Sequence, residues 1–420
     1  MTPRPRPYPN SSHSPSLSLS PGIDMVKTLD AKLARILADP ACGDFILADA
    51  KDGDMAYGAR GLGLRPDGGV RSLEDYREEM RRNLDQGLID ILLMSVSSCE
   101  ALAIREARFR SSPVTPAVRA NDTTDIHLAR GGVYPRLPSR PFRTATLDHA
   151  MYGRLLRDGE RAGAPLLGAD LGLYSITFNN DLERDLEALE RYRDFRVEAE
   201  LCGFRHFLEL FDPNACGDRC PRETGRYLND MVARTLAGVA GPGRPIFLKV
   251  PFHGPEAMEE LAAYDRALVP GILGGAAGTT YDAFEQLHLA RKHGARVALY
   301  GRMINQAEDQ RALIQHLRWI ADGQLTDPAE GVRSYHGELA RRGLRPTRSL
   351  EEDLKSTRRA GAYAGSASVL VGAQAKAALD AAPAAGPAGS PAPSVPASPA
   401  PAPRVDALAR FRERWGRVLG

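Results

Sequence analysis

Lys249 is the residue whose type and position point most directly to chemistry. It lies in the apolar run 245–251, which is typical of a strand buried on both faces. The chain has only seven lysines against 48 arginines, so a lysine inside a strand is informative. Only an amine can lose its charge and attack a carbonyl to form a Schiff base, and desolvation favours that neutral form. The alternative is a structural lysine whose ammonium reaches water.

Glu209 places a carboxylate inside a second apolar run, 206–211. Burying it without a partner would cost several kcal/mol, so we expect it to pair with Lys249 on the neighbouring strand. The two residues then form either a catalytic pair or a buried ion pair with no chemistry.

Asp49 and Lys51 follow the first apolar run and share one face of the strand by its period of two. A carboxylate near a Schiff-base lysine can transfer protons, and we predict this role for Asp49. We expect Lys51 either to hold a second phosphate or carboxylate of the substrate, or to pair with Asp52 or Asp54 at the surface.

A phosphate cradle is predicted from Gly274, Gly275, Gly301 and Arg302. Small residues let main-chain N–H groups approach an anion, and arginine adds a bidentate contact. The alternative is that these glycines only make tight turns and allow close helix packing.

The elements that must position these residues are apolar runs alternating with amphipathic helical segments. Eight such runs occur: 45–48, 89–94, 114–118, 171–178, 206–211, 246–250, 268–273 and 297–300. Eight strand–helix units predict a parallel (β/α)8 TIM barrel over residues 25–343, with catalytic groups at the carboxyl ends of the strands. A doubly wound sheet is the alternative fold, but no dinucleotide-binding glycine motif follows the first run.

Helix boundaries are signalled by capping boxes and glycines. The predicted boxes are Ser72 with Asp75, Thr279 with Asp282, and Asn305 with Glu308, while Gly87 and Gly203 fall at predicted helix ends.

Composition divides the flanks of the barrel. Residues 1–24 are rich in Ser and Pro and are predicted to be disordered, so that Met25 is a candidate start. Residues 344–377 form a C-terminal extension, 378–403 an Ala/Pro-rich linker, and 404–420 a short amphipathic helix.

Bulk properties exclude several classes of function. The net charge of +2 indicates neither a nucleic-acid nor a membrane partner, and no apolar segment is long enough to span a bilayer. Five cysteines, an odd number, predict a reducing cytoplasm rather than a disulfide framework. Cys216 and Cys220 lack the second pair that a zinc site needs, so we expect no metal.

The ordered set of Asp49, Glu209, Lys249, the glycine-rich loop after strand seven and Gly301-Arg302 resembles the class I, Schiff-base aldolases. The nearest branch is that of the tagatose-bisphosphate and sulfofructose-phosphate aldolases, although Asp49-Ala50-Lys51 stands where that branch has Asp-Gln-Arg. The resemblance implies a metal-independent carbon–carbon lyase without a cofactor, acting on a phosphorylated sugar or a related hydroxy-carbonyl compound. In it, Lys249 forms the Schiff base, Glu209 and Asp49 transfer protons, and Gly275 and Arg302 bind phosphate.

Two other functions stay open from the residues themselves. One is a phosphate-binding isomerase or epimerase in which Lys249 acts as a base, and the other is a non-catalytic barrel used as a scaffold. We also expect a homo-oligomer.

The helix predicted for 404–420 follows a long Ala/Pro linker and resembles the encapsulation peptides that carry enzymes into bacterial microcompartments. The resemblance implies recruitment to a shell or partner protein. The alternative is that the helix folds back onto the barrel.

Overall fold

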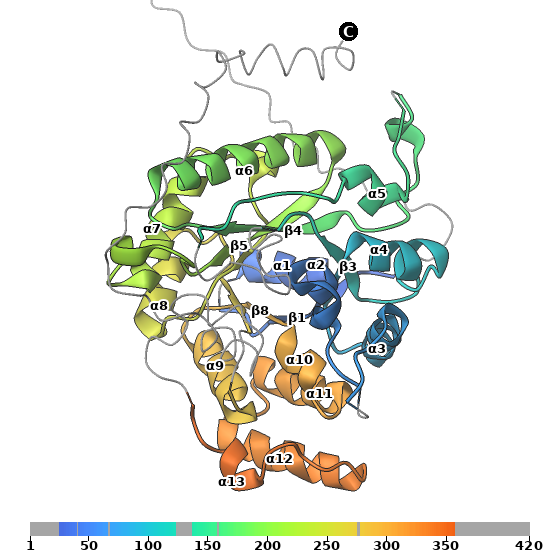
Figure 1. Ribbon diagram of the computed structural model, residues 1–420, viewed down its shortest axis with the longest axis vertical. Coiled ribbons are helices and arrows are strands. Elements are labelled where there is room, and N and C mark those ends of the chain that lie inside the picture. Colours follow the sequence, from blue (N-terminus) through green and yellow to red (C-terminus); the bar gives the residue numbers. More distant parts are fainter. Residues whose placement is uncertain are drawn as a thin grey trace, which may run out of the picture.

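The computed structural model describes residues 25–39, 41–65, 68–122, 137–157, 159–274 and 278–357, and they contain an eight-stranded parallel barrel (Figure 1). The strands are β1 (Ile46–Lys51), β2 (Ile91–Met94), β3 (Thr115–Arg119), β4 (Leu171–Thr177), β5 (Arg205–Phe211), β6 (Leu248–Lys249), β7 (Gly271–Leu273) and β8 (Val297–Tyr300). The strand order is β6-β5-β4-β3-β2-β1-β8-β7. Main-chain bonds from Leu248 N to Val269 O (2.9 Å) and from Val250 N to Gly271 O (2.9 Å) join the two ends. The predicted TIM barrel is therefore confirmed.

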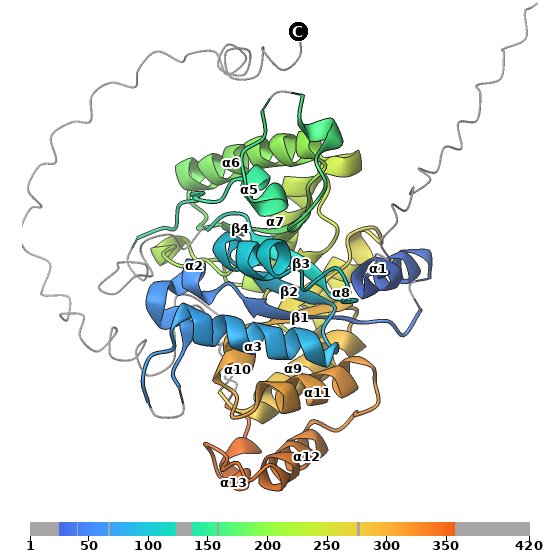
Figure 2. The ribbon, with the colours of Figure 1, turned by 90° about the vertical axis from the view of Figure 1, so that its right-hand side faces the viewer.

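Helices surround the barrel. Their bounds are α1 (Thr28–Ala38), α2 (Gly53–Tyr57), α3 (Leu73–Gln86), α4 (Val96–Cys99), α5 (Leu147–Tyr152), α6 (Leu182–Cys202), α7 (Thr224–Leu236), α8 (Pro255–Tyr264), α9 (Thr280–Lys292), α10 (Arg302–Gln306), α11 (Gln310–Ala321), α12 (Pro328–Arg341) and α13 (Leu350–Asp353). Figure 2 shows α1 and α2 at opposite ends of the strands. Leu29 and Ile36 of α1 belong to the same apolar cluster as the strand side chains inside the barrel, so α1 closes the end at which the strands begin.

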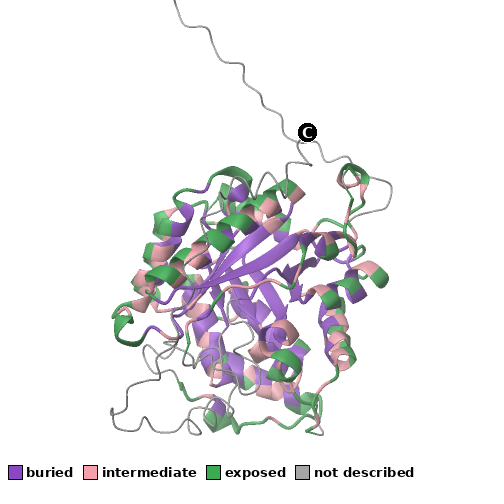
Figure 3. Cartoon of the chain, turned by 45° about the horizontal axis from the view of Figure 1, so that its top comes forward, coloured by how far each residue is buried: buried purple, intermediate pink, exposed green. Residues whose placement is uncertain are grey.

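The strands carry two separate apolar layers. Inside the barrel lie Ile46, Ala48 and Ala50 of β1, whereas Phe45 and Leu47 pack outward against the helices. The strands are buried except for the half-buried ends of β5, and exposed residues are confined to helices and loops (Figure 3). Because side chains alternate along a strand, a shift of one position moves a residue from one layer to the other.

Most predicted helix boundaries are confirmed. The capping boxes of Ser72 with Asp75 and of Thr279 with Asp282 are formed, and Gly87 and Gly203 are left-handed, with φ of 70° and 68°. The box predicted for Asn305 and Glu308 is wrong, since Asn305 lies within α10 and the side chain of Asp309 caps α11 instead.

The extension after the barrel packs on α9. Thr280 N donates to Asp353 Oδ1 (2.8 Å), and Thr357 N donates to Asp282 Oδ1 (3.0 Å). The predicted extension 344–377 is described only as far as Thr357. The predictions for 1–24, 378–403 and 404–420 lie outside the described residues.

Two findings bear on the composition. Cys216 and Cys220 are joined by a disulfide, which the odd cysteine count did not predict. Within the described ranges, no helix is both long enough and apolar enough to cross a bilayer.

Candidate active site

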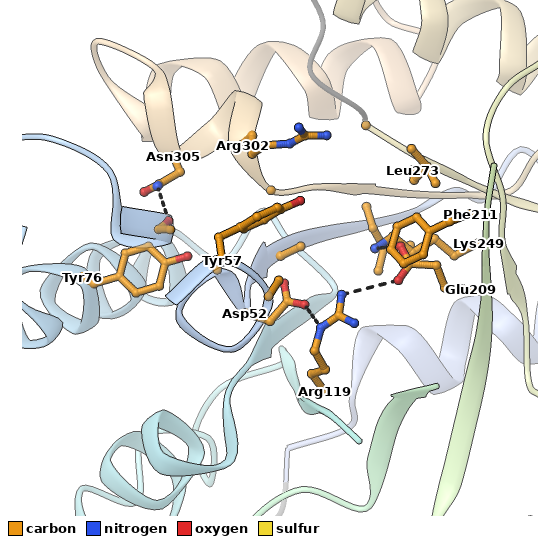
Figure 4. A pocket seen from close by; sticks show the side chains of 17 residues that line it. Asp52, Tyr57, Tyr76, Arg119, Glu209, Phe211, Lys249, Leu273, Arg302 and Asn305 are labelled. Atoms are coloured by element: carbon orange, nitrogen blue, oxygen red, sulfur yellow. Dashed lines mark hydrogen bonds and ion pairs between the residues drawn. The ribbon is translucent and has the colours of Figure 1, made fainter. Parts of the chain in front are cut away.

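A pocket opens where the strands end, and it encloses about 670 Å³, part of it open to solvent. Its lining comes from β1 and the segment up to residue 61, α3, β3, β5, β6, β7 and the β8–α10 segment: Ala50, Asp52, Gly53, Ala56, Tyr57, Gly61, Tyr76, Arg119, Glu209, Phe211, Lys249, Leu273, Gly274, Leu299, Gly301, Arg302 and Asn305 (Figure 4).

Lys249 and Glu209 meet inside the barrel, as predicted. They are paired in the parallel register of β5 and β6, which directs both side chains inward. Lys249 Nζ lies 2.5 Å from Glu209 Oε1, with side-chain exposures of 8% and 1%. The amine is thus almost removed from solvent and still borders the pocket.

The second oxygen of Glu209 is held by the neighbouring strand. Ser175 Oγ donates to Glu209 Oε2 at 2.6 Å, because Ser175 and Glu209 are register partners on β4 and β5. Asn121 fixes Ser175 in turn: Asn121 Oδ1 accepts from Ser175 N (2.6 Å), and its Nδ2 donates to Ser175 O (2.9 Å). Asn121 therefore fixes the orientation of the Glu209 carboxylate indirectly, by holding the main chain of Ser175.

Arg119 joins Glu209 to a second carboxylate, that of Asp52. Its Nε donates to Asp52 Oδ2 at 2.6 Å, and its Nη2 lies 3.5 Å from Glu209 Oε2. Burial acts to lower the pKa of Arg119, but the charges of Asp52, Asp122 and Glu209 outweigh it and raise the pKa. This guanidinium therefore stays charged in the barrel.

Asp52 is held ionised beside the pocket. Burial acts to raise its pKa, but the positive charges of Arg119 and Lys249 and the bond from Arg119 lower it overall. A buried carboxylate in its charged form can accept a proton from a bound molecule.

Asp49 and Lys51 are not brought to this pocket, which corrects the sequence prediction. Both side chains are fully buried and point outward from β1. Lys51 Nζ lies 3.4 Å from Asp49 Oδ1. Asn83 of α3 donates to Asp49 Oδ2 (2.8 Å), and Lys51 Nζ donates to Gln310 Oε1 of α11 (2.8 Å). Burial raises the pKa of Asp49 and lowers that of Lys51.

Asp49 and Lys51 point away from the pocket because side chains alternate between the inside and the outside of the barrel along β1. The inward series Ile46, Ala48 and Ala50 continues to Asp52 at the pocket, whereas Asp49 and Lys51 belong to the outward series. Asp52 is also buried and paired with Arg119, not at the surface with Lys51.

The predicted phosphate cradle is partly in place. Gly274, Gly301 and Arg302 line the pocket, while Gly275 lies outside the described residues. A side chain on Gly274 would meet the Tyr300 ring at 2.3 Å, and one on Gly301 would meet Ala50 O at 2.9 Å. Both positions therefore need glycine for packing, which was the alternative considered for them. Arg302 Cζ lies 5.8 Å from the centre of the Tyr57 ring.

The start of α9 already holds acidic side chains. Thr279 N donates to Asp282 Oδ2 (3.1 Å) and Thr280 N to Asp353 Oδ1 (2.8 Å). An anion would meet two carboxylates at these N–H groups. The cradle consequently depends on Arg302 and the glycines before this helix.

Sequence reasoning missed Asp52, Tyr57, Arg119 and Ser175. The sequence did contain a signal for Arg119, because it is a charged residue at the end of an apolar run. The direction of Tyr57 depends on how the loop after β1 folds, which local sequence does not specify. Within the described ranges, no group of three or more His, Cys, Asp or Glu side chains is placed to hold a metal ion.

Comparison with known proteins finds no matching family model and no matching curated protein. Among solved structures, the chain is similar to a fructose-bisphosphate aldolase from Slackia heliotrinireducens, with a TM-score of 0.51 and 14% identity over 76% of this chain and 95% of that one. It is also similar to an archaeal fructose 1,6-bisphosphate aldolase, with a TM-score of 0.48 and 14% identity over 70% of this chain and 99% of that one. At 14% identity and a TM-score of 0.51, the likeness to the Slackia heliotrinireducens protein shows a shared barrel fold.

Proposed function

We propose that this chain is a metal-independent class I aldolase that acts on a phosphorylated sugar or a related hydroxy-carbonyl compound. The observation that carries the proposal is the Lys249–Glu209 pair, a shielded amine 2.5 Å from a carboxylate at the pocket wall. A structural ion pair has no need of a pocket, whereas Schiff-base formation needs an amine, a proton acceptor and room for a carbonyl.

In the first stage, Glu209 takes a proton from the Lys249 ammonium. The neutral amine attacks the substrate carbonyl, forming a carbon–nitrogen bond as the carbonyl π bond breaks, and the proton that the nitrogen then loses is transferred to the former carbonyl oxygen. Loss of this oxygen as water gives an iminium, with Glu209 returning the proton that the departing hydroxyl needs.

In the second stage, a base removes the proton of the hydroxyl on the far carbon of the bond to be cleaved, which is the carbon that becomes the aldehyde. Asp52 is the candidate, since it lines the pocket together with Lys249 and Arg119 and Lys249 keep it ionised. The carbon–carbon bond breaks, its electron pair moves onto the iminium to give an enamine, and an aldehyde leaves. Protonation of the enamine carbon and hydrolysis of the iminium restore Lys249.

The substrate class is supported by charge at the mouth of the pocket. Arg302, with Gly274 and Gly301, offers a cation and close main-chain approach for a phosphate. The neighbour from Slackia heliotrinireducens bears the name of a fructose-bisphosphate aldolase, so fructose 1,6-bisphosphate joins tagatose and sulfofructose phosphates as a compound to test.

The decisive experiment is borohydride reduction with each candidate sugar phosphate, followed by intact-mass analysis and peptide mapping. A stable adduct on Lys249 is expected, and its mass reports which compound reacted. Turnover of a sugar phosphate with no trapped adduct would contradict the Schiff base and favour the isomerase or epimerase alternative.

We also propose that the segment 404–420 recruits the enzyme to a shell or partner protein, and thereby to a bacterial microcompartment. The support is its apolar face and its Ala/Pro linker in the sequence.

A further inference from the structure

The helix α6 (Leu182–Cys202) is apolar on two opposite faces. Its inner face buries Ala188, Tyr192, Phe195 and Ala199. Its outer face exposes Leu182 (72%), Leu186 (48%), Val197 (40%) and Leu201 (56%). A surface helix normally has a polar outer face, and aligned exposed aliphatic side chains mark an interaction surface.

The outer residues form one line along the helix, which we call the α6 stripe: Leu182, Leu186, Glu190, Arg193, Val197 and Leu201. Successive members are three or four positions apart, so each lies one turn above the last. Followed from either end, the stripe presents the same order of residue types, apart from the sign of the central charge. Leucine stands at each end, an aliphatic residue comes next, and the two central residues, Glu190 and Arg193, have opposite charges.

We propose that the α6 stripe is a homodimer interface in which two copies of α6 pack antiparallel about a twofold axis. A twofold interface requires a surface complementary to itself. In this arrangement Leu182 meets Leu201 of the partner subunit and Leu186 meets Val197 of the partner subunit. Glu190 faces Arg193 of the partner subunit, and symmetry repeats each contact. The stripe spans about 28 Å at 1.5 Å per residue.

Charge complementarity favours a second copy as the occupant. Among the described residues, Glu190 has no ion-pair partner, and it is exposed. Arg193 contacts its sequence neighbour Asp194 at 3.2 Å, where the two side chains are 57% and 64% exposed. Each copy thus offers an acid and a base at the positions where the antiparallel copy needs the opposite charge.

Two of the acidic residues beside the stripe are paired within the chain. Glu187 and Glu198 would bring extra negative charge to the interface, but each is neutralised within the chain. Arg140 Nη2 donates to Glu187 Oε1 (2.9 Å) and Arg143 Nη1 to Glu198 Oε2 (2.7 Å). The helix α6 lies on the outside of the barrel (Figure 1), and no residue of the stripe lines the pocket.

Charge reversal in the full-length chain tests this proposal, with mass measured by sedimentation equilibrium at micromolar concentration. Wild type should have an even multiple of the 45.6 kDa chain mass. Glu190→Arg and Arg193→Glu should each weaken the dimer at least about tenfold, because each places like charges opposite one another twice. The double variant restores opposite charges across the axis and should restore the mass.

Two further variants sharpen the test. Leu186→Glu should dissociate the dimer without changing the melting temperature much, since Leu186 is already half exposed. Glu256→Arg on α8, a reversal at an 88% exposed glutamate away from the stripe, should leave the mass unchanged. A monomeric wild type would overturn the proposal, and that is the outcome expected if the segment 404–420 covered the stripe. Single reversals that leave the dimer intact, or a double variant that stays dissociated, would overturn it as well.

Discussion

Lys249 Nζ and Glu209 Oε1 are 2.5 Å apart across the β5–β6 register, and the other oxygen of Glu209 is anchored by Ser175 at 2.6 Å. The carboxylate therefore cannot turn away from the amine without losing a buried hydrogen bond. A proton acceptor fixed beside the nucleophile is the arrangement that amine attack on a carbonyl requires.

Lys249→Met should abolish turnover while preserving the fold, because Met has a similar volume but no amine. Lys249→Arg should be nearly as inactive, since a guanidinium stays protonated. Steady-state assays with the trapped sugar phosphate check both, with circular dichroism as the control for folding. Substantial turnover by either variant would remove the Schiff base from the mechanism.

Glu209→Gln should lower kcat by about 10²–10⁴ if this carboxylate transfers protons. Phosphate binding should change little, because Glu209 lies across the pocket from Arg302 (Figure 4). The measurements are kcat and inhibition by inorganic phosphate. A normal kcat together with a lower melting temperature would identify a purely structural ion pair.

Asp52→Asn and Asp49→Asn form a matched pair that separates the two faces of β1. Asp52→Asn should reduce kcat by about 10²–10⁴ through loss of the base. Asp49→Asn should leave kcat of the folded enzyme nearly unchanged and lower the free energy of unfolding by about 3–5 kcal/mol, because Lys51 loses its buried counter-charge. Urea unfolding and steady-state kinetics on both variants check the assignment. If Asp49→Asn lowered kcat and Asp52→Asn did not, Asp49 would be the catalytic base.

The direction in which the Asp49 side chain points could not be predicted from the sequence. The barrel followed from the alternation of apolar runs and helices, and the Lys249–Glu209 pair followed from two ionisable residues in neighbouring buried strands. The run that holds Asp49 is apolar on both faces, so its pattern does not say which face looks inward. That choice depends on the barrel register, in which Asp49 pairs with Leu92 and Tyr300.

Arg119 and Ser175 were missed for a related reason. Their importance comes from contacts between residues separated by 56 and 34 positions along the chain, Arg119 with Ser175 (3.1 Å) and Ser175 with Glu209 (2.6 Å). Local periodicity indicates that a strand exists but not which polar side chains of different strands share its interior.

Arg302→Ala should raise KM for phosphorylated substrates far more than for their unphosphorylated analogues. One charged hydrogen-bonded contact is worth about 1.5–3 kcal/mol, or roughly 10- to 150-fold in KM. The comparison of the two substrate series is its own control, because a general distortion of the pocket would affect both. Equal effects would mean that Arg302 does not contact phosphate.

The C-terminal segment should act as a transferable recruitment signal. On a helical wheel Val405, Leu408, Phe411, Trp415 and Leu419 share one side of the predicted helix. A helix this short is marginal alone in water and needs a surface to cover that side. The Ala/Pro linker provides reach, which local docking on the barrel would not require.

Residues 378–420 fused to a fluorescent protein should therefore form discrete foci in the native host and co-purify with a shell or partner protein. The same fusion carrying Phe411→Asp and Trp415→Asp is the matched control and should be diffuse, because both changes place charge on the apolar side. Diffuse fluorescence from the unmodified fusion, with no partner recovered, would show that this segment has no recruiting role.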